Sequence, residues 1–372
     1  MTSEEIKALW NRAILLHGQS RFAEALECMA ALEPSLPDDP RLLSNLGVVC
    51  RDTGDLVRAE HYLRRACALR PDDPAIHYNL ALALLRAGRL SEGFDEYEWR
   101  WQVSRFRQQR RQFTQPLWRG EPLQGRRILI YGEQGAGDTI QFARYAPLVR
   151  EAGGDVTLEV LPHLERLASW MPGGYRIVGP FAAGLEFDVQ CPLMSLPHRF
   201  ATEVDSIPAP ARFSIPTDVQ AEWARRVRTG RTAIGVVWSG NPAYADNRAR
   251  SLPAGLLLPL TSLSAIDWWS LQVGAATADI PAGLVSLADH LIDFAETAAA
   301  ISQLDLIVTV DTAVAHLAGS LGKPVWLLLA YSADWRWLLH RADTPWYPSV
   351  RIFRQQRPGD WDEVIERVAA EL

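Results

Sequence analysis

The sequence has few cysteines, no long hydrophobic run and no excess of positive charge. Four of its 372 residues are cysteines, and none forms a C-x-x-C pair, so we expect small core thiols in a reducing compartment. No apolar run reaches the roughly 20 residues that span a bilayer. The first residues, MTSEEIKALW, are acidic and lack the apolar segment of a secretion signal. We therefore expect a cytoplasmic protein without a membrane span.

The charge balance gives no reason to expect a nucleic-acid partner. The net charge is -6, and Lys and Arg form no large patch apart from Arg105–Arg111. Hydrophobic residues make up 48% and charged residues 22%, which indicates a globular chain throughout, and its length allows two or three domains.

The N-terminal third repeats with a period of 34 residues. Small residues recur at two positions of the period: Ala25, Ala59 and Gly93 at one, Ala13, Gly47 and Ala81 at the other. Small side chains there let paired helices approach closely, and a Pro-Asp-Asp segment ends each of the first two units. This tetratricopeptide pattern predicts an α-helical solenoid over residues 1–107, with units near 6–39, 40–73 and 74–107. The concave face of such an array typically binds a peptide or another protein, and a purely structural or oligomerisation surface is the alternative.

The pattern changes after the array. Residues 108–126 have no periodicity and are interpreted as a linker. Strands are expected at 127–131, 156–160, 176–178 and 187–190, and then at 233–238, 267–272, 306–310, 325–329 and 350–353. Because they alternate with helices, they predict parallel, doubly wound α/β sheets. We expect two facing Rossmann-like domains, 127–216 and 217–372, with the final helix, 361–372, packing back on the first.

Polar residues follow the expected strand at 306–310. Asp311 and Thr312 end it, and a helix from Ala313 to Leu321 comes next. The first N–H groups of a helix have no internal partners, so they can hold a phosphate at the carboxyl edge of an open sheet. His316 lies about one helical turn further on, where it can reach the same ligand. The alternative is a helix cap followed by a core histidine with its own partners.

The glycine-rich stretch Gly132–Asp138, GEQGAGD, is a second candidate site. Its order differs from the G-x-G-x-x-G of a dinucleotide site, and no G-K-[ST] follows, so it is no Walker A loop. Glu159, about 20 residues on, keeps a dehydrogenase as an alternative. Asp138 stands at a strand-to-helix turn, where it is either a helix cap or a general base.

Three stretches in this order, GEQGAGDTIQFARYAPLV, VVWSGNPAYADNRARSL and DTAVAHLAGSLGKP, resemble the heptosyltransferase-like glycosyltransferases of family 9. More narrowly, the chain resembles their bacterial branch that carries tetratricopeptide repeats. The resemblance implies the GT-B fold and an inverting transfer from a nucleotide sugar. It implies an acceptor on the first domain and a donor mainly on the second. The layout is also similar to that of protein O-GlcNAc transferases, whose repeats hold a protein acceptor.

The resemblance assigns roles to individual residues. Asp138 matches the catalytic aspartate, which deprotonates the acceptor hydroxyl. The triplet Asp311, Thr312 and Ala313 matches the donor-binding D-T/S-G, with Ala313 where the family usually has Gly, so that closer approach of the backbone is restricted. His316 matches the family histidine. Arg250, with Arg248 as the alternative, would neutralise the leaving diphosphate, so that no metal cofactor is expected.

Further contacts are expected around these residues. Donor contacts are assigned to Trp238, Ser239, Gly240 and Asn241, for which a structural turn is the alternative, and to Gln272. Sugar or acceptor contacts are assigned to Gln134, Gln141, Trp335 and Arg336. Buried packing is the alternative for the neighbouring tryptophans, Trp335 and Trp337.

Together these features predict a cytoplasmic inverting glycosyltransferase whose repeats recruit a protein or peptide acceptor. Besides the dehydrogenase, two alternatives stay open: an enzyme that glycosylates a lipopolysaccharide or another glycan, and a repeat-based scaffold whose transferase half has lost catalysis. Only Ala313 favours the scaffold, and the retained Asp138, Asp311 and His316 argue against it.

Overall fold

A computed structural model gives the fold, and it describes residues 1–107, 110–242, 247–274, 277 and 280–372. Residues 108–109 of the expected linker and 243–246 of the second motif lie outside the described residues. The chain divides into two compact units. The first comprises residues 1–111, 201–206 and 332–341, and the second comprises 112–200, 207–331 and 342–372. Within the part of the chain that is described, no helix combines the length and the apolar character needed to cross a bilayer.

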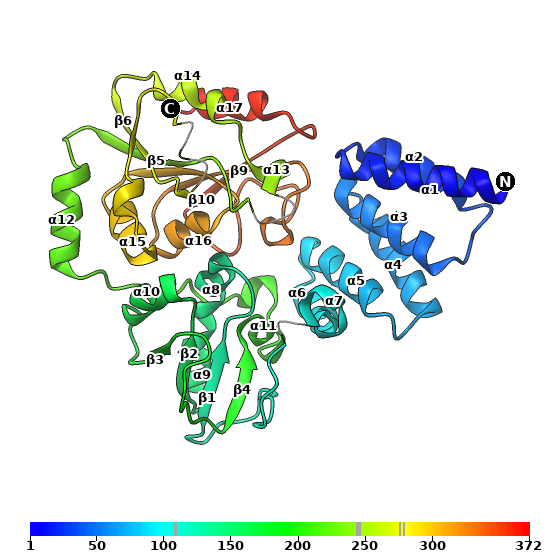
Figure 1. Ribbon diagram of the computed structural model, residues 1–372, viewed down its shortest axis with the longest axis horizontal. Helices are drawn as coiled ribbons and strands as arrows, with labels where there is room; N and C mark the ends of the chain where they lie inside the picture. Colours follow the sequence, from blue (N-terminus) through cyan, green and yellow to red (C-terminus); the bar gives the residue numbers. More distant parts are fainter. Residues whose placement is uncertain (108–109, 243–246, 275–276, 278–279) are drawn as a thin grey trace. The chain divides into compact units, whose positions relative to one another are not determined.

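The first unit is built from three packed pairs of helices (Figure 1). These are α1 (Ser3–Gly18) with α2 (Phe22–Leu32), α3 (Pro40–Thr53) with α4 (Leu56–Leu69), and α5 (Pro74–Arg86) with α6 (Leu90–Tyr97). The repeated small residues lie where the two helices of a pair touch: a Cβ added to Gly47 of α3 would stand 2.4 Å from Leu63 Cγ of α4. The repeated aspartates cap the next helix, since Asp39 Oδ1 accepts the Arg41 N–H at 2.8 Å and Asp73 Oδ1 accepts the Ala75 N–H at 3.0 Å. The array therefore has the helical organisation that its period predicts.

A distant segment of the chain completes the array. Residues 332–341 follow strand β9 (Val325–Leu329) in sequence, yet they belong to the first unit. Within this segment the short helix η9 (Trp335–Trp337) packs on α5, and the Trp335 ring meets Phe94 of α6 edge-on at 5.6 Å between centroids. Ser332 Oγ donates to Asp52 Oδ1 at 3.1 Å and lies 3.1 Å from Arg86 Nη1. The third pair is thus covered by residues from far along the sequence.

The second unit contains two parallel sheets. The first has the order β3-β2-β1-β4, with β1 (Arg127–Tyr131), β2 (Asp155–Glu159), β3 (Arg176–Val178) and β4 (Val189–Pro192). Its helices are α8 (Ala136–Phe142), α9 (Ala146–Glu151), α10 (Glu165–Ser169) and α11 (Leu196–Arg199). The helical stretch after β1 is divided into α8, η2 (Ala143–Tyr145) and α9, because Pro147 begins a new helix rather than continuing one.

The expected linker is not free of structure. Residues 112–126 belong to the second unit, where Leu117 forms a bridge with Gln190 of β4. Trp118 is fully buried, and its indole N–H donates to the Glu121 carbonyl at 2.7 Å. Residues 112–126 are therefore anchored within the second unit rather than forming a free linker.

The second sheet has the order β10-β9-β8-β5-β6-β7, and all of its strands are parallel. Its strands besides β9 are β5 (Thr232–Val237), β6 (Ile266–Ser270), β7 (Leu284–Ser286), β8 (Leu306–Val310) and β10 (Val350–Arg354). Its helices are α12 (Thr217–Val227), α13 (Asn247–Arg250), α14 (Leu258–Thr261), α15 (Phe294–Ser302), α16 (Ala313–Ser320) and α17 (Trp361–Ala369). The expected parallel α/β architecture with two sheets is confirmed, although the short β7 was not anticipated.

The final helix corrects one expectation. Its apolar stripe, Trp361, Val364, Ile365 and Val368, shares a core with Ile234 of β5, Val308 of β8 and Phe353 of β10. It therefore covers the second sheet, and the prediction that it packs back on the first domain is wrong. The reason is local. Helix α17 is the next helix after β10, and its apolar stripe covers apolar residues of the sheet to which β10 belongs.

Both sheets reverse their strand order once, between β1 and β4 and between β5 and β8. In open parallel sheets, ligands bind beyond the carboxyl ends of the strands at this reversal. The three stretches that carry the predicted site follow β1, β5 and β8 directly. The topology therefore places them at the edges where a ligand is expected.

Candidate functional site

The site centres on the contact between two helices that follow central strands of different sheets. Helix α8, which follows β1, packs directly against α16, which follows β8. Gly137 in the first turn of α8 faces His316 and Ala313 of α16. A Cβ added to Gly137 would stand 3.0 Å from His316 Cδ2 and 3.4 Å from Ala313 Cα. The glycine therefore allows the two helix starts to come within van der Waals distance.

Asp138 is the next residue on α8. It occupies the third helical position, and its Oδ2 accepts the Gly135 N–H at 2.8 Å, while the side chain remains only partly buried. The carboxylate therefore orders the helix start and lies in the same helical turn that touches His316. A helix-ordering role does not compete with proton transfer, because a carboxylate has two oxygens and about four lone pairs. Its role as general base stays a prediction.

The start of α16 is capped by its own threonine, and its role as an anion site stays a prediction. Thr312 is the N-cap, and its Oγ1 accepts the Val314 N–H at 3.3 Å and lies 3.2 Å from Thr309 Oγ1. Asp311 and Ala313 flank the cap and are partly exposed. His316 is 5% exposed, and its Nδ1 lies 3.1 Å from the Tyr347 hydroxyl. The histidine thus has a core partner on one nitrogen and faces α8 with the other edge of its ring.

The loop after β5 brings a guanidinium close to backbone. A Cβ on Gly240 would stand 2.8 Å from Nη2 and 2.9 Å from Nε of Arg250, so the guanidinium lies directly against this glycine. Arg250 Nε also donates to Asn247 Oδ1 at 3.4 Å. Ser239 Oγ lies 3.2 Å from Ser251 Oγ, which ties the strand end to the residue after Arg250. Arg248 is exposed, so Arg250 is the better placed of the two arginines.

The side chain of Gln272 holds this loop through hydrogen bonds. Its Oε1 accepts the N–H groups of Trp238 at 3.2 Å and Ser239 at 3.0 Å, and the side chain is 4% exposed. Trp238 is 3% exposed and belongs to the core of the second sheet, so its indole faces inward. These two side chains hold the loop in place. Donor contact by either stays a prediction, and their positions favour a supporting role.

Four residues expected to touch sugar or acceptor have different surroundings. Gln141 is fully buried, and its backbone carbonyl accepts the Arg144 Nε–H at 2.8 Å. Trp335 and Arg336 are buried within the first unit, where the Arg336 guanidinium lies 4.4 Å from the Trp335 ring centroid. Gln134, in the loop before α8, is partly exposed, as is appropriate for a contact residue. Asn241, a predicted donor contact, is exposed.

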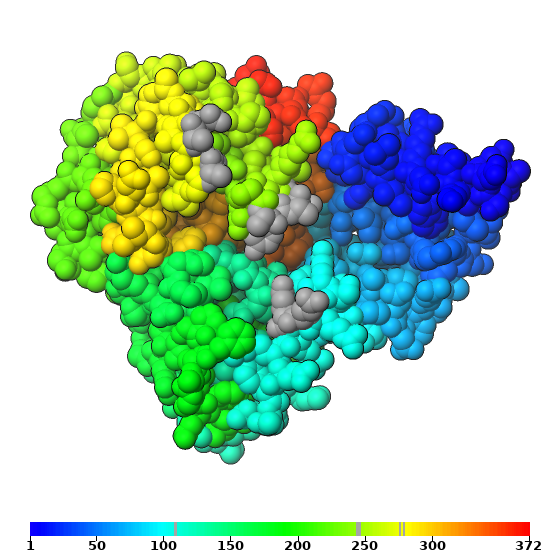
Figure 2. Space-filling view, viewed as in Figure 1, coloured from blue at the N-terminus to red at the C-terminus, as the bar shows by residue number. Residues whose placement is uncertain are grey.

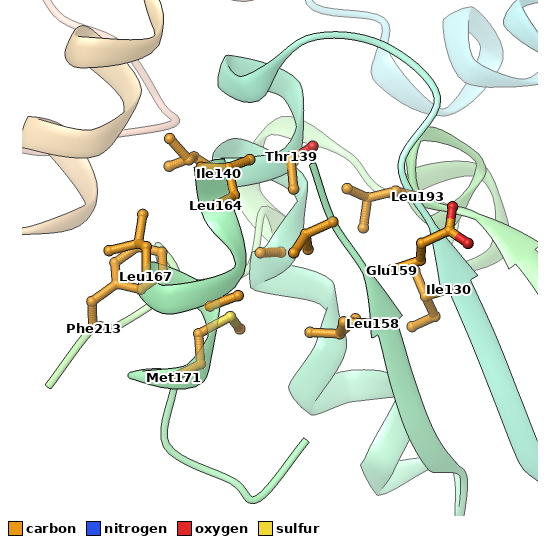
Figure 3. Close-up of a pocket in the computed structure, with 13 residues that line it drawn as sticks. Ile130, Thr139, Ile140, Leu158, Glu159, Leu164, Leu167, Met171, Leu193 and Phe213 are labelled. Atoms are coloured by element: carbon orange, nitrogen blue, oxygen red, sulfur yellow. The ribbon is translucent and has the colours of Figure 1, made fainter. Parts of the chain in front are cut away.

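An apolar hollow lies beside α8 in the first sheet (Figure 3). Its volume is about 20 Å³, room for about one water molecule, and it is lined on one side by Thr139 and Ile140, which follow Asp138. Leu158, Leu167 and Met171 line its other walls, whereas the carboxylate of Glu159 points away from this apolar cluster. The hollow is therefore a small gap in the packed core beside α8.

Two parts of the sequence match models of known families. Residues 11–74 and 51–100 match the tetratricopeptide repeat, and residues 276–367 match glycosyltransferase family 9 (heptosyltransferase). The chain is 24% identical over 436 residues to protein FlbA of Caulobacter vibrioides, covering 99% of this chain and 73% of that protein. The chain thus combines a tetratricopeptide array with a region similar to family 9 glycosyltransferases.

Two solved glycosyltransferase structures align with about two thirds of this chain. A family 9 glycosyl transferase from Veillonella parvula has a TM-score of 0.49 and 11% identity, covering 67% of this chain and 90% of that one. The ADP-heptose lipopolysaccharide heptosyltransferase II of E. coli has a TM-score of 0.46 and 13% identity, covering 66% and 99%.

Sequence reasoning did not single out three residues around the site. Ser251 and Gly137 both lie inside the stretches that carry the family resemblance. Their small side chains near helix ends could have indicated close contacts at the site. Tyr347 lies in a loop between β9 and β10, and nothing in the local pattern connects it with His316.

Proposed function

We propose that the protein is an inverting GT-B glycosyltransferase that moves a sugar from a nucleotide donor to an acceptor hydroxyl without a metal ion. The observation that carries this proposal is the packing of α8 on α16, which brings the turn containing Asp138 against His316 and Ala313. An acceptor base and a phosphate-binding helix start must be adjacent for direct transfer. The match of residues 276–367 to family 9 supports the same reaction class.

The chemistry follows from the positions of these groups. Asp138 takes the proton from the acceptor hydroxyl as that oxygen attacks the anomeric carbon from the face opposite the leaving group. The bond from the anomeric carbon to the phosphate oxygen breaks, and its electron pair leaves with the nucleotide. The Arg250 guanidinium and the N–H groups at the start of α16 balance the charge that develops there.

Binding of a panel of nucleotide sugars tests the donor side. Calorimetry with UDP-, GDP-, ADP-, CMP- and dTDP-sugars should find one class that binds, and a ligand at 100 times its Kd should stabilise the fold by about 2.7 kcal/mol. Arg250→Ala and Asp311→Ala should lose that binding. Arg248→Ala is the matched control, because it removes an exposed arginine two residues away and should bind normally. Equal binding by all three variants would overturn the assignment.

We also propose that the array recruits a protein acceptor. Helix α3 packs on α5, and the first helices of such an array are expected to line its concave side. Much of the third pair is already occupied by the chain itself, since Arg105 lies 4.7 Å from the Tyr78 ring centroid and residues 332–341 cover α5. The first two pairs remain for a partner, and Figure 2 shows the atoms of α1 and α2 in dark blue at the N-terminal end of the array.

Exposed apolar residues of the array allow a matched test. Ile14 on α1 is 53% exposed, and Val57 on α4 is 82% exposed. Ile14→Glu should lower transfer to a protein acceptor without changing donor hydrolysis, whereas Val57→Glu, on a second helix of a pair, should change neither. Loss of donor hydrolysis in Ile14→Glu would contradict separate roles. Deleting residues 1–107 would expose residues 332–341, which pack within the array. Single substitutions avoid this disturbance.

A glycan acceptor is the second candidate, because the matched family model is described as heptosyltransferase. Transfer to a lipopolysaccharide core, with Ile14→Glu as active as the wild type, would select it.

A further inference from the structure

Three buried side chains lie behind the contact between α8 and α16. His316 is 5% exposed, Arg144 is 2% exposed and Tyr347 is fully buried. The Tyr347 hydroxyl lies 3.1 Å from His316 Nδ1, and the two rings are tilted by 60° at 5.7 Å between centroids. None of the three stretches that carry the family resemblance includes Tyr347.

Tyr347 is held on two sides. On one side lies Gly319 of α16, where an added Cβ would stand 2.6 Å from Tyr347 Cγ, so only glycine leaves room for the ring. On the other side, the Arg144 guanidinium carbon lies 4.8 Å from the ring centroid. Arg144 is itself fixed by carbonyls, because it donates to Gln141 at 2.8 Å and to Trp346 at 3.0 Å. The tyrosine hydroxyl therefore has one well-defined position.

This position determines what His316 offers to a ligand. A neutral imidazole has one donor and one acceptor nitrogen. The Tyr347 hydroxyl can donate to Nδ1 or accept from it, and donation places the ring proton on Nε2. The Nε2 edge faces the first turn of α8, since a Cβ on Gly137 would stand 3.6 Å from His316 Nε2. An N–H at this edge can donate to a phosphate or sugar oxygen.

We propose that Tyr347, braced by Arg144 and Gly319, is a positioning residue that fixes the ring orientation and the tautomer of His316, so that Nε2–H donates to the diphosphate of the donor. The part concerning the donor rests on the proposed function. The part concerning His316 does not, because the hydroxyl and the ring nitrogen are adjacent whatever the protein binds.

Nitrogen NMR of the ligand-free protein tests the second part. In protein labelled with ¹⁵N-histidine, His316→Gln identifies the signals of this ring. We expect a protonated Nε2 and a hydrogen-bonded, unprotonated Nδ1, and Tyr347→Phe should shift the Nδ1 resonance towards that of a nitrogen without a hydrogen bond. Tyr62→Phe is the matched control, because it also removes a buried hydroxyl with a 3.1 Å hydrogen bond, to Glu33. An unchanged His316 ring in folded Tyr347→Phe would overturn the proposal.

Nucleotide binding tests the link to the donor. Tyr347→Phe should weaken binding of the nucleoside diphosphate by about three- to tenfold, and binding of the corresponding monophosphate much less. His316→Gln should show a similar preference, and the double variant should bind no worse than His316→Gln alone. Additive losses would mean that Tyr347 acts independently of His316, which contradicts a positioning role. If the wild type binds no nucleotide, the proposed function fails, while the NMR result still decides the relation of Tyr347 to His316.

Discussion

Gly137 of α8 lies against His316 of α16 so closely that an added Cβ would stand 3.0 Å from the histidine Cδ2. Asp138 is the next residue, so this contact sets the distance between the predicted base and the predicted donor site. A methyl group there must displace either the ring or the helix start by a few tenths of an ångström. The effect should appear in catalysis rather than in stability, because alanine is the better helix former by up to about 1 kcal/mol.

We therefore predict that Gly137→Ala lowers the transfer rate by about tenfold or more, since small misplacements of reacting groups are costly. Its unfolding free energy should stay close to that of the wild type. Gly255→Ala is the control: no atom lies within 4 Å of its added Cβ, so neither quantity should change. Steady-state kinetics and urea unfolding measure the two effects. A fully active Gly137→Ala would show that the contact does not matter for transfer.

Trp335 provides a prediction about the array. Its ring is 5% exposed and meets Phe94 edge-on, so removing it opens a cavity inside the first unit. Trp335→Ala should lower the free energy of unfolding by about 3–5 kcal/mol, with donor binding retained in the folded protein. Trp335→Phe should lose much less. If Trp335→Ala were stable but bound sugar donors or acceptors poorly, the original assignment of Trp335 to a sugar contact would be favoured instead.

Asp52 provides a pH-dependent prediction. Burial opposes its charge, but the adjacent Arg51 charge and hydrogen bonds from His17 and Arg51 outweigh burial and hold the pKa of Asp52 well below its usual range. An aspartate in the unfolded chain titrates near about 3.9, so the unfolded state binds the proton first as the pH falls. The stabilisation by Asp52 is thus complete above about pH 5 and is lost progressively as the pH falls towards the lowered pKa.

Asp52→Asn should therefore unfold more easily at pH 7, by roughly 3–5 kcal/mol, because buried Arg86 and nearby Arg51 lose their carboxylate partner. It should also lose less stability than the wild type between pH 5 and pH 3. Urea unfolding across this range measures both effects. Asp38→Asn, which removes a carboxylate with a 75% exposed side chain, should leave the wild-type pH profile intact. An identical acid response in Asp52→Asn and the wild type would contradict this account.

Much of the fold could be predicted because its signals are local. The spacing of Gly47 and Ala81 reflects a contact between consecutive helices, and β1, β5 and β8 are short apolar runs followed by polar residues. The candidate residues were found for the same reason, since Asp138, Gly240 and Asp311 all lie just after strands. The sheet orders place these strand ends at the two reversals.

The remaining features depend on residues that are far apart in the sequence. Tyr347 reaches His316 across 31 positions, and Gln272 reaches the Ser239 N–H across 33. Segment 332–341 packs with helices about 250 residues earlier, as the Ser332–Asp52 separation of 280 positions illustrates. No periodicity or spacing encodes such pairs in a single sequence. The composition of the pair Trp335 and Trp337 allowed both a sugar platform and a packed core, and only the tertiary contacts distinguish them.

The central claim is that Asp138 is the base of a sugar transfer. Its most direct test is single-turnover transfer, or donor hydrolysis with water as acceptor, in the wild type and in Asp138→Asn. Asn can still accept the Gly135 N–H, so the helix start is preserved. We predict a rate lower by about 10²–10⁴-fold with an unchanged Kd for the donor, whereas Asp155→Asn, at an exposed strand start, should react normally. Undiminished transfer by Asp138→Asn would contradict the mechanism.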